Sequence, residues 1–108
     1  MLNIHIVTEI NSEFAVSPED GDIVYSLIED NLKKNSPVTL DFSDVDIVTT
    51  AFLNNAIGKL YKKFEKDQLN QLISITNVSN SDLILIKKVI ERAKLTFTDE
   101  LKEEFDDE

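Results

Sequence analysis

The chain has 108 residues, which is enough for one domain with a single core. It carries 21 acidic and 11 basic residues, a net charge of −10, and this argues against nucleic acid or an anionic membrane as a partner. The absence of cysteine excludes a disulfide framework, a thiolate nucleophile and a cysteine-based zinc site. No apolar run approaches the roughly 20 residues of a membrane helix, and the first residues lack a signal-peptide pattern. We therefore expect a cytoplasmic protein whose partner, if the charge steers it, presents a basic surface.

A strand followed by an amphipathic helix is the pattern of residues 1–37. Apolar and polar residues alternate over residues 2–8, which predicts a half-buried strand. Ser17 is a good N-cap and Pro18 fits the first position of a helix, which ends before Pro37. Gly21 lies inside the first turn of this predicted helix, where it costs about 1 kcal/mol relative to alanine.

Two more strand–helix units follow along the chain. The segments 38–43 and 71–76 have the composition of buried strands. Thr49 or Thr50 is the expected cap of the helix in the second unit, and the last helix is expected to start at about residue 80. An apolar stripe at helical spacing runs along the second-unit helix: Leu53, Ala56, Ile57, Leu60 and Phe64.

Shorter segments complete the predicted organisation. Phe14 and Val16 favour an additional short strand, and Leu95 to Phe97 favours a short edge strand. The sequence after it, DELKEEFDDE, is strongly acidic and is typical of a frayed or disordered terminus. We predict one domain over residues 1–97 and an acidic C-terminal tail over residues 98–108.

The order of these elements predicts the fold class. Strands separated by helices of about 15 residues are typical of parallel strands joined by right-handed crossovers. We therefore expect a small α/β sandwich, with a mostly parallel sheet of three to five strands and three main helices packed against it.

The sequence lacks the residues that most catalytic sites and cofactor sites require. Gly21 and Gly58 are the only glycines and neither follows a predicted strand, so a phosphate-binding glycine loop is excluded. His5, the only histidine, is read as a strand residue on the more polar face. Asp41, Asp44 and Asp46 are spaced loosely like a calcium loop, but the required Gly and later Glu are missing. We expect no enzyme activity, no metal and no cofactor, nucleotides included.

The acidic residues after the second strand allow two interpretations. Ligands and phosphoacceptors gather at the carboxyl ends of parallel strands, so Asp41 or Asp44 would suit a receiver-like phosphodomain. Such a domain also needs an acidic pair after the first strand and a lysine after a later one, and the sequence supplies neither. The favoured interpretation is that Asp and Ser shape the turn through side-chain hydrogen bonds to the backbone.

The run LDFSDVDIVTTAFLNNAIGKLY resembles the STAS-like domain family of unknown function, a relative of the STAS anti-sigma-factor antagonists. The resemblance rests on a strand ending in Asp41-Phe42, a short loop, a hydroxyl-rich step at Thr49-Thr50 and Phe52 at the start of a helix. The predicted element order agrees with that family from Met1 to about Phe97. It implies the STAS-like sandwich fold and a non-enzymatic, regulatory activity.

STAS antagonists bind a kinase-like anti-sigma ATPase, which phosphorylates them on a Ser at the start of this helix. The resemblance places that phosphoacceptor at Thr50, with Thr49 as the neighbouring candidate. The sequence departs from the antagonists in two ways: Thr49 replaces the Asp that usually precedes the acceptor, and Ala51-Phe52 replace the Gly that follows. Phosphorylation would add charge beside Asp44 and Asp46 and should weaken an acidic or apolar partner contact.

We therefore predict a regulatory protein-interaction domain. Its partner would be a protein such as a kinase-like ATPase or anti-sigma factor, with no nucleic acid and no membrane. The alternative is a purely structural or oligomerising module, such as a homodimer formed through a sheet edge. The predicted partner-binding surface consists of Asp44, Asp46, Thr49, Thr50, Phe52, Leu53 and Asn55.

Overall fold

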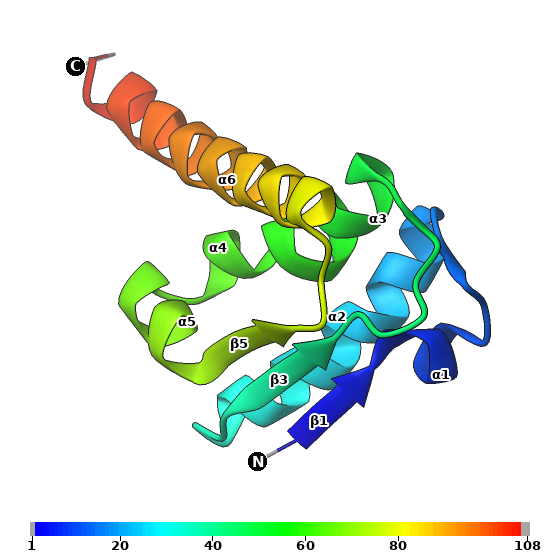
Figure 1. The fold of residues 1–108 in the computed structure, drawn as a ribbon. Coiled ribbons are helices and arrows are strands. Elements are labelled where there is room, and N and C mark those ends of the chain that lie inside the picture. Colours follow the sequence, from blue (N-terminus) through cyan, green and yellow to red (C-terminus); the bar gives the residue numbers. More distant parts are fainter. Residues whose placement is uncertain (1, 107–108) are drawn as a thin grey trace.

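A three-stranded parallel sheet forms the base of the fold. The computed structural model shown in Figure 1 describes the backbone of residues 2–106 and the side chains of residues 2–94. The strands are β1 (Leu2–His5), β3 (Val38–Asp41) and β5 (Ile73–Thr76), and β3 lies between the other two. Leu2 pairs with Val38, and Val38 pairs with Ile73, in parallel register. The predicted α/β class and the predicted parallel pairing of the three strands are confirmed.

The two faces of this sheet differ in polarity. One face presents aliphatic side chains in register: Leu2, Val38, Ile73, Ile4, Leu40 and Ile75. The opposite face presents Asn3, Thr39 and Ser74. Figure 1 shows helix α2 (Pro18–Lys33) behind the sheet and no helix of residues 2–106 in front of it. The aliphatic face is thus covered by helices. No helix of residues 2–106 covers the polar face, where Asn3 and Ser74 are exposed and the central Thr39 is buried between its neighbours, an arrangement more usual for antiparallel than for parallel sheets.

Three helical bodies form much of the rest of the core. The middle body is nearly continuous: α3 (Thr50–Leu53), a π-helical turn η1 (Asn54–Gly58) and α4 (Leu60–Lys63). It packs between α2 and the long helix α6 (Asn80–Asp106). The π turn is closed by a hydrogen bond from the Lys59 N–H to the Asn54 carbonyl (3.0 Å), and its Ala56, Ile57 and Gly58 are all buried.

Gly21 allows α2 to approach the middle helix closely. A Cβ atom at this position would lie 2.5 Å from the Phe52 carbonyl oxygen and 2.9 Å from the Asn55 Cβ. Real Cβ atoms essentially never come within 3.0 Å of such neighbours. The glycine that weakens the helix by propensity therefore has a packing function, because it permits direct contact between α2 and the backbone of α3 and η1.

The first strand is shorter than predicted. It stops at His5, and residues 6–10 form helix α1 (Ile6–Ile10), so the strand predicted over residues 2–8 is wrong at its end. Ile6 and Ile10 are both buried, at the i, i+4 spacing of a helix. Leu2, Ile4 and Ile6 are separated by polar residues, as in a strand, and Ile6 and Ile10 are four residues apart, as in a helix. Ile6 therefore fits both patterns equally.

Several short elements lie outside the predicted pattern. Helix α5 (Lys66–Leu72) precedes β5, and strand β4 (Ile47–Val48) lies in the loop after β3. The predicted extra strand near Phe14 is present as β2 (Phe14–Ala15), and it pairs in parallel with β4.

The end of the chain also differs from expectation. The edge strand predicted at Leu95 to Phe97 is wrong, because helix α6 continues through these residues to Asp106. The sequence of α6 contains no Gly or Pro, the residues that usually end a helix. The division into a domain over 1–97 and a tail over 98–108 remains a prediction, and residues 107–108 lie outside the described part. None of the described helices has both the length and the apolar content needed to span a membrane.

Candidate functional site

The loop that follows β3 is organised by Asp41. Its Oδ1 accepts hydrogen bonds from the Ser43 hydroxyl (2.6 Å), the Ser43 N–H (2.9 Å) and the Asn77 side chain (3.0 Å). These donors, the Ser43 hydroxyl first, lower the pKa of Asp41 to about 2. Asp44 then adopts a left-handed conformation (φ 67°), which Asp tolerates better than most residues. The predicted role of Asp and Ser in shaping this turn is confirmed for Asp41 and Ser43.

The β2–β4 ribbon carries this loop across to the N-terminal part of the chain. The Asp46 N–H donates to the Glu13 carbonyl (2.8 Å), and the Thr49 N–H donates to the Ala15 carbonyl (3.1 Å). Ala15 and Val48 are buried beneath the ribbon. The ribbon thereby fixes the start of α3 against the segment that leads into α2.

The two threonines at the start of α3 have different environments. Thr49 is the N-cap: its Oγ1 accepts from the Phe52 N–H (3.3 Å) and donates to the Val16 carbonyl (2.9 Å). Thr50 is the first residue of α3 and is exposed, and its hydroxyl makes no hydrogen bond with the side chains of residues 2–94. The sequence predicted either Thr49 or Thr50 as the N-cap of this helix, and the structure shows that it is Thr49. The hydroxyl of Thr50 is the accessible one.

Phe52 and Leu53 do not lie on the surface. Both side chains are completely buried, at 0% exposure, and belong to the core. Their inclusion in the predicted partner-binding surface is therefore wrong. They begin the apolar stripe of the middle helix, and burial of that stripe between α2 and α6 removes both from contact with solvent.

Asn55 is half-buried and already has partners. Its Nδ2 donates to the Pro18 carbonyl (3.3 Å) and to Asp22 Oδ1 (3.0 Å). Asp22 Oδ1 also accepts a hydrogen bond from Lys59 Nζ (2.7 Å). This hydrogen bond is the main cause of the lowered pKa of Asp22. Asn55 therefore ties the π turn to α2. Of the predicted surface, Asp44, Asp46 and Thr50 are exposed, and Thr49 and Asn55 are partly exposed.

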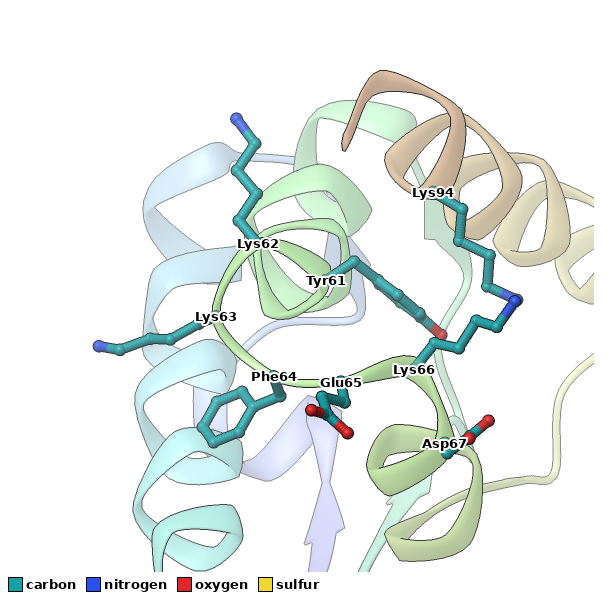
Figure 2. Close-up of a pocket in the computed structure, with 8 residues that line it drawn as sticks. All are labelled: Tyr61, Lys62, Lys63, Phe64, Glu65, Lys66, Asp67 and Lys94. Carbon is teal, nitrogen blue, oxygen red and sulfur yellow. The ribbon is translucent and has the colours of Figure 1, made fainter. Parts of the chain in front are cut away.

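An open groove lies at the other end of the middle helix (Figure 2). It has a volume of about 450 Å³, and its lining is formed by Tyr61, Lys62, Lys63, Phe64, Glu65, Lys66, Asp67 and Lys94. Lys94 Nζ lies 5.7 Å from the centre of the Tyr61 ring, and desolvation raises the pKa of Tyr61. Lys63 points away from the groove in Figure 2, and its Nζ pairs with Glu29 (2.6 Å).

His5, the only histidine of the sequence, lies at the end of β1, where its Nδ1 is 2.6 Å from the Thr8 hydroxyl. Within the described residues, no three His, Asp or Glu side chains are grouped so that they could hold a metal ion. The groove was not anticipated from the sequence.

The comparison with known families identifies the chain. Residues 20–83 match the family model of the STAS-like domain of unknown function (DUF4325). The chain belongs to this family. The match runs from the first turn of α2 to the start of α6, and it includes β3, the β4 loop, the middle helix and β5. No curated protein and no solved structure matches the chain.

Membership confirms the family expected from the residues 40–61. A STAS-like domain is consistent with a regulatory role in protein interaction, and such domains are generally non-catalytic. The family match contains Thr49, Thr50 and Ile47, whereas β1, α1 and β2 precede it.

Proposed function

We propose that this STAS-like domain is a non-enzymatic regulatory module that docks a protein partner through the surface at the start of α3. This docking surface consists of Asp44, Asp46, Thr49 and Thr50, together with the β2–β4 ribbon beside them. The resemblance to STAS antagonists supports a kinase-like ATPase or an anti-sigma factor as the partner class. We further propose that phosphorylation of Thr50 controls the docking.

The observation that carries this proposal is the contrast between the two threonines. The Thr49 hydroxyl is used twice, as acceptor from Phe52 and as donor to Val16, so its modification would remove the cap of α3. The Thr50 hydroxyl is exposed on the first turn of the same helix. A kinase can reach it without disturbing the hydrogen bonds that hold the loop, which supports Thr50 over Thr49 as the acceptor.

A phosphate at Thr50 would change the surface without unfolding it. It would add a charge of about −1.5 to −2 close to the exposed carboxylates of Asp44 and Asp46. Negative charge in the first turn of a helix is locally favourable, so the fold should persist. A partner that buries this surface would have to desolvate the added charge, and binding should weaken.

The test is affinity capture from the native cell extract with wild type, Thr50→Ala and Thr50→Glu. Ser81→Glu is the matched control, because Ser81 is an exposed hydroxyl in the first turn of another helix, α6. We expect Thr50→Ala and Ser81→Glu to retain the partner and Thr50→Glu to lose it, with closely similar melting temperatures. Retention of every partner by Thr50→Glu would contradict the proposal.

A structural or oligomerising module is the second candidate function. The outer edges of β1 and β5 pair with no other strand among residues 2–106, so either could add a strand from a second copy. Light scattering separates the two functions. A stable dimer whose mass is unchanged by Thr50→Glu, in a chain that captures no other protein, would favour this alternative.

A further inference from the structure

Three exposed apolar side chains belong to the β2–β4 ribbon and to the residue that directly follows β2. Phe14, Val16 and Ile47 are 47%, 40% and 49% exposed, and we refer to them together as the ribbon patch. Phe14 and Ile47 are direct partners in the parallel register, so their side chains lie on the same face of the ribbon. Ala15 and Val48 occupy the opposite face and are buried. The ribbon is therefore apolar on both faces, although only one of them contacts the core.

The ribbon patch adjoins the proposed docking surface. The Val16 carbonyl accepts the Thr49 hydroxyl, and the Ala15 carbonyl accepts the Thr49 N–H. Thr50 is the next residue. Single exposed apolar residues are ordinary, but a group of them beside a candidate regulatory site is typical of a protein contact. The patch thus supplies the apolar contact that the sequence had assigned to the buried Phe52 and Leu53.

Charge defines what can cover this patch. The sequence has no Lys or Arg over residues 1–32 or over residues 35–58. In the segments that contain the two strands of the ribbon, every Asp, Glu, Lys or Arg is therefore an acid. Glu13 and Asp46, which precede Phe14 and Ile47, are exposed, and so is Asp44. A partner that buries the patch must come close to these carboxylates, and complementary positive charge would speed and orient its approach.

Other occupants fit this pattern less well. If a second copy bound patch against patch about a two-fold axis, the acidic segments around Glu13 and Asp46 of the two copies would be brought close together. Like charges set against each other oppose association. An anionic membrane would be repelled for the same reason.

We propose that the ribbon patch is the main contact for the partner, and that the partner presents apolar side chains flanked by Lys or Arg. This inference rests on the proposed function, because it names the chemistry of the partner at the same surface. A phosphate on Thr50, next to the Thr49 that bonds Val16, would lie beside this contact. If the bound partner buries that dianion against apolar side chains and away from the cations at the rim, desolvation of the phosphate opposes binding.

The test uses the purified 108-residue chain and three synthetic peptides as probes. One peptide is amphipathic with leucines and lysines, the second has glutamate in place of lysine, and the third keeps the lysines but has serine in place of leucine. Affinities are measured by calorimetry at low salt for wild type, Phe14→Ser, Ile47→Ser and Ile84→Ser. Ile84 is the matched control, because it is an exposed isoleucine (56%) on α6.

We expect wild type to bind the leucine–lysine peptide most tightly. Phe14→Ser and Ile47→Ser should each weaken that binding about tenfold or more, and Ile84→Ser should leave it unchanged. Equal binding of the lysine–serine peptide, or an equal loss in Ile84→Ser, would overturn the inference. So would light scattering that shows a wild-type dimer and an Ile47→Ser monomer, because a second copy would then cover the patch.

The peptide experiment and the capture experiment test two proposals that can fail independently, the assignment of the patch and the phosphorylation switch. The peptides contact the patch whether or not Thr50 is ever modified. If the peptides bind as expected and Thr50→Glu still captures every partner, the patch stands and the phosphorylation switch fails. Phe14→Ser and Ile47→Ser are therefore added to the capture experiment. If Thr50→Glu loses the partner but these two variants keep it, the switch stands and the assignment of the patch fails.

Discussion

Replacement of Gly21 by alanine tests how the docking surface is held in place. The added Cβ would lie 2.5 Å from the Phe52 carbonyl oxygen, whereas an ordinary contact begins at 3.4 Å. The two helices would have to separate locally by several tenths of an ångström. The second contact, with the Asn55 Cβ at 2.9 Å, leaves no easy direction for this movement. We therefore expect Gly21→Ala to destabilise the protein.

The magnitude follows from two opposing contributions. Alanine gains about 1 kcal/mol over glycine in helix propensity. Overpacking of a closely fitted contact costs about 1–3 kcal/mol, and here the contact is with backbone, which places the cost near the upper value. The expected net loss in the free energy of unfolding is about 1–2 kcal/mol.

Gly58→Ala is the matched control for this substitution. Gly58 is also buried and helical, but a Cβ there would meet Asn54 Oδ1 and Val89 Cγ1 at 3.7 Å, which is ordinary contact. Propensity should dominate, so this variant should be as stable as wild type or more stable by up to about 1 kcal/mol. Urea denaturation of the three proteins measures the difference. If Gly21→Ala is as stable as wild type, the close approach of α2 to the middle helix is wrong.

Two further predictions concern the polar groups that hold the loop. Thr49→Ala should cost about 1–2 kcal/mol of unfolding free energy, because it removes the cap of α3 and the bond to Val16, whereas Thr50→Ala should cost almost nothing in the same urea titration. Asp41 has a native pKa of about 2, below the ordinary value of about 3.9, so its ionised form stabilises the fold above pH 4 and that contribution is lost as the pH falls towards 2. Acid unfolding of Asp41→Asn should therefore depend less on pH than that of wild type between pH 4 and 2, and identical curves would contradict this role.

The sequence predicted those elements of the fold whose local residue pattern fits only a strand or only a helix. The strand predicted over residues 38–43 is present as Val38–Asp41, and the predicted helix start at Ser17-Pro18 is present too, because buried strands and helix caps have local signals. The end of β1 was predicted wrongly, since Ile6 fits a strand and a helix equally. Strands β2 and β4 have only two residues each, too few to show a period.

Within the predicted partner-binding surface, the sequence could not separate exposed residues from buried ones. The motif around Thr49-Thr50 located the start of α3 correctly. It could not show that Phe52 is buried, because a Phe at a helix start can point either way until a second helix covers it. Phe14 and Val16 are 31 or more residues from Ile47 in the sequence and were read only as a short strand. Their contact with the loop depends on the parallel β2–β4 pairing, which is long-range and has no local signal.

The most direct test of the docking surface is the hydrogen exchange footprint of the bound partner. The partner recovered with wild type would be purified, and amide exchange of the domain would be measured with and without it. We predict that the partner slows exchange over residues 13–16 and 46–50 and leaves the open sheet face, at Asn3 and Ser74, unchanged. Slowed exchange confined to β1, β5 or α6, with none at residues 46–50, would contradict the account.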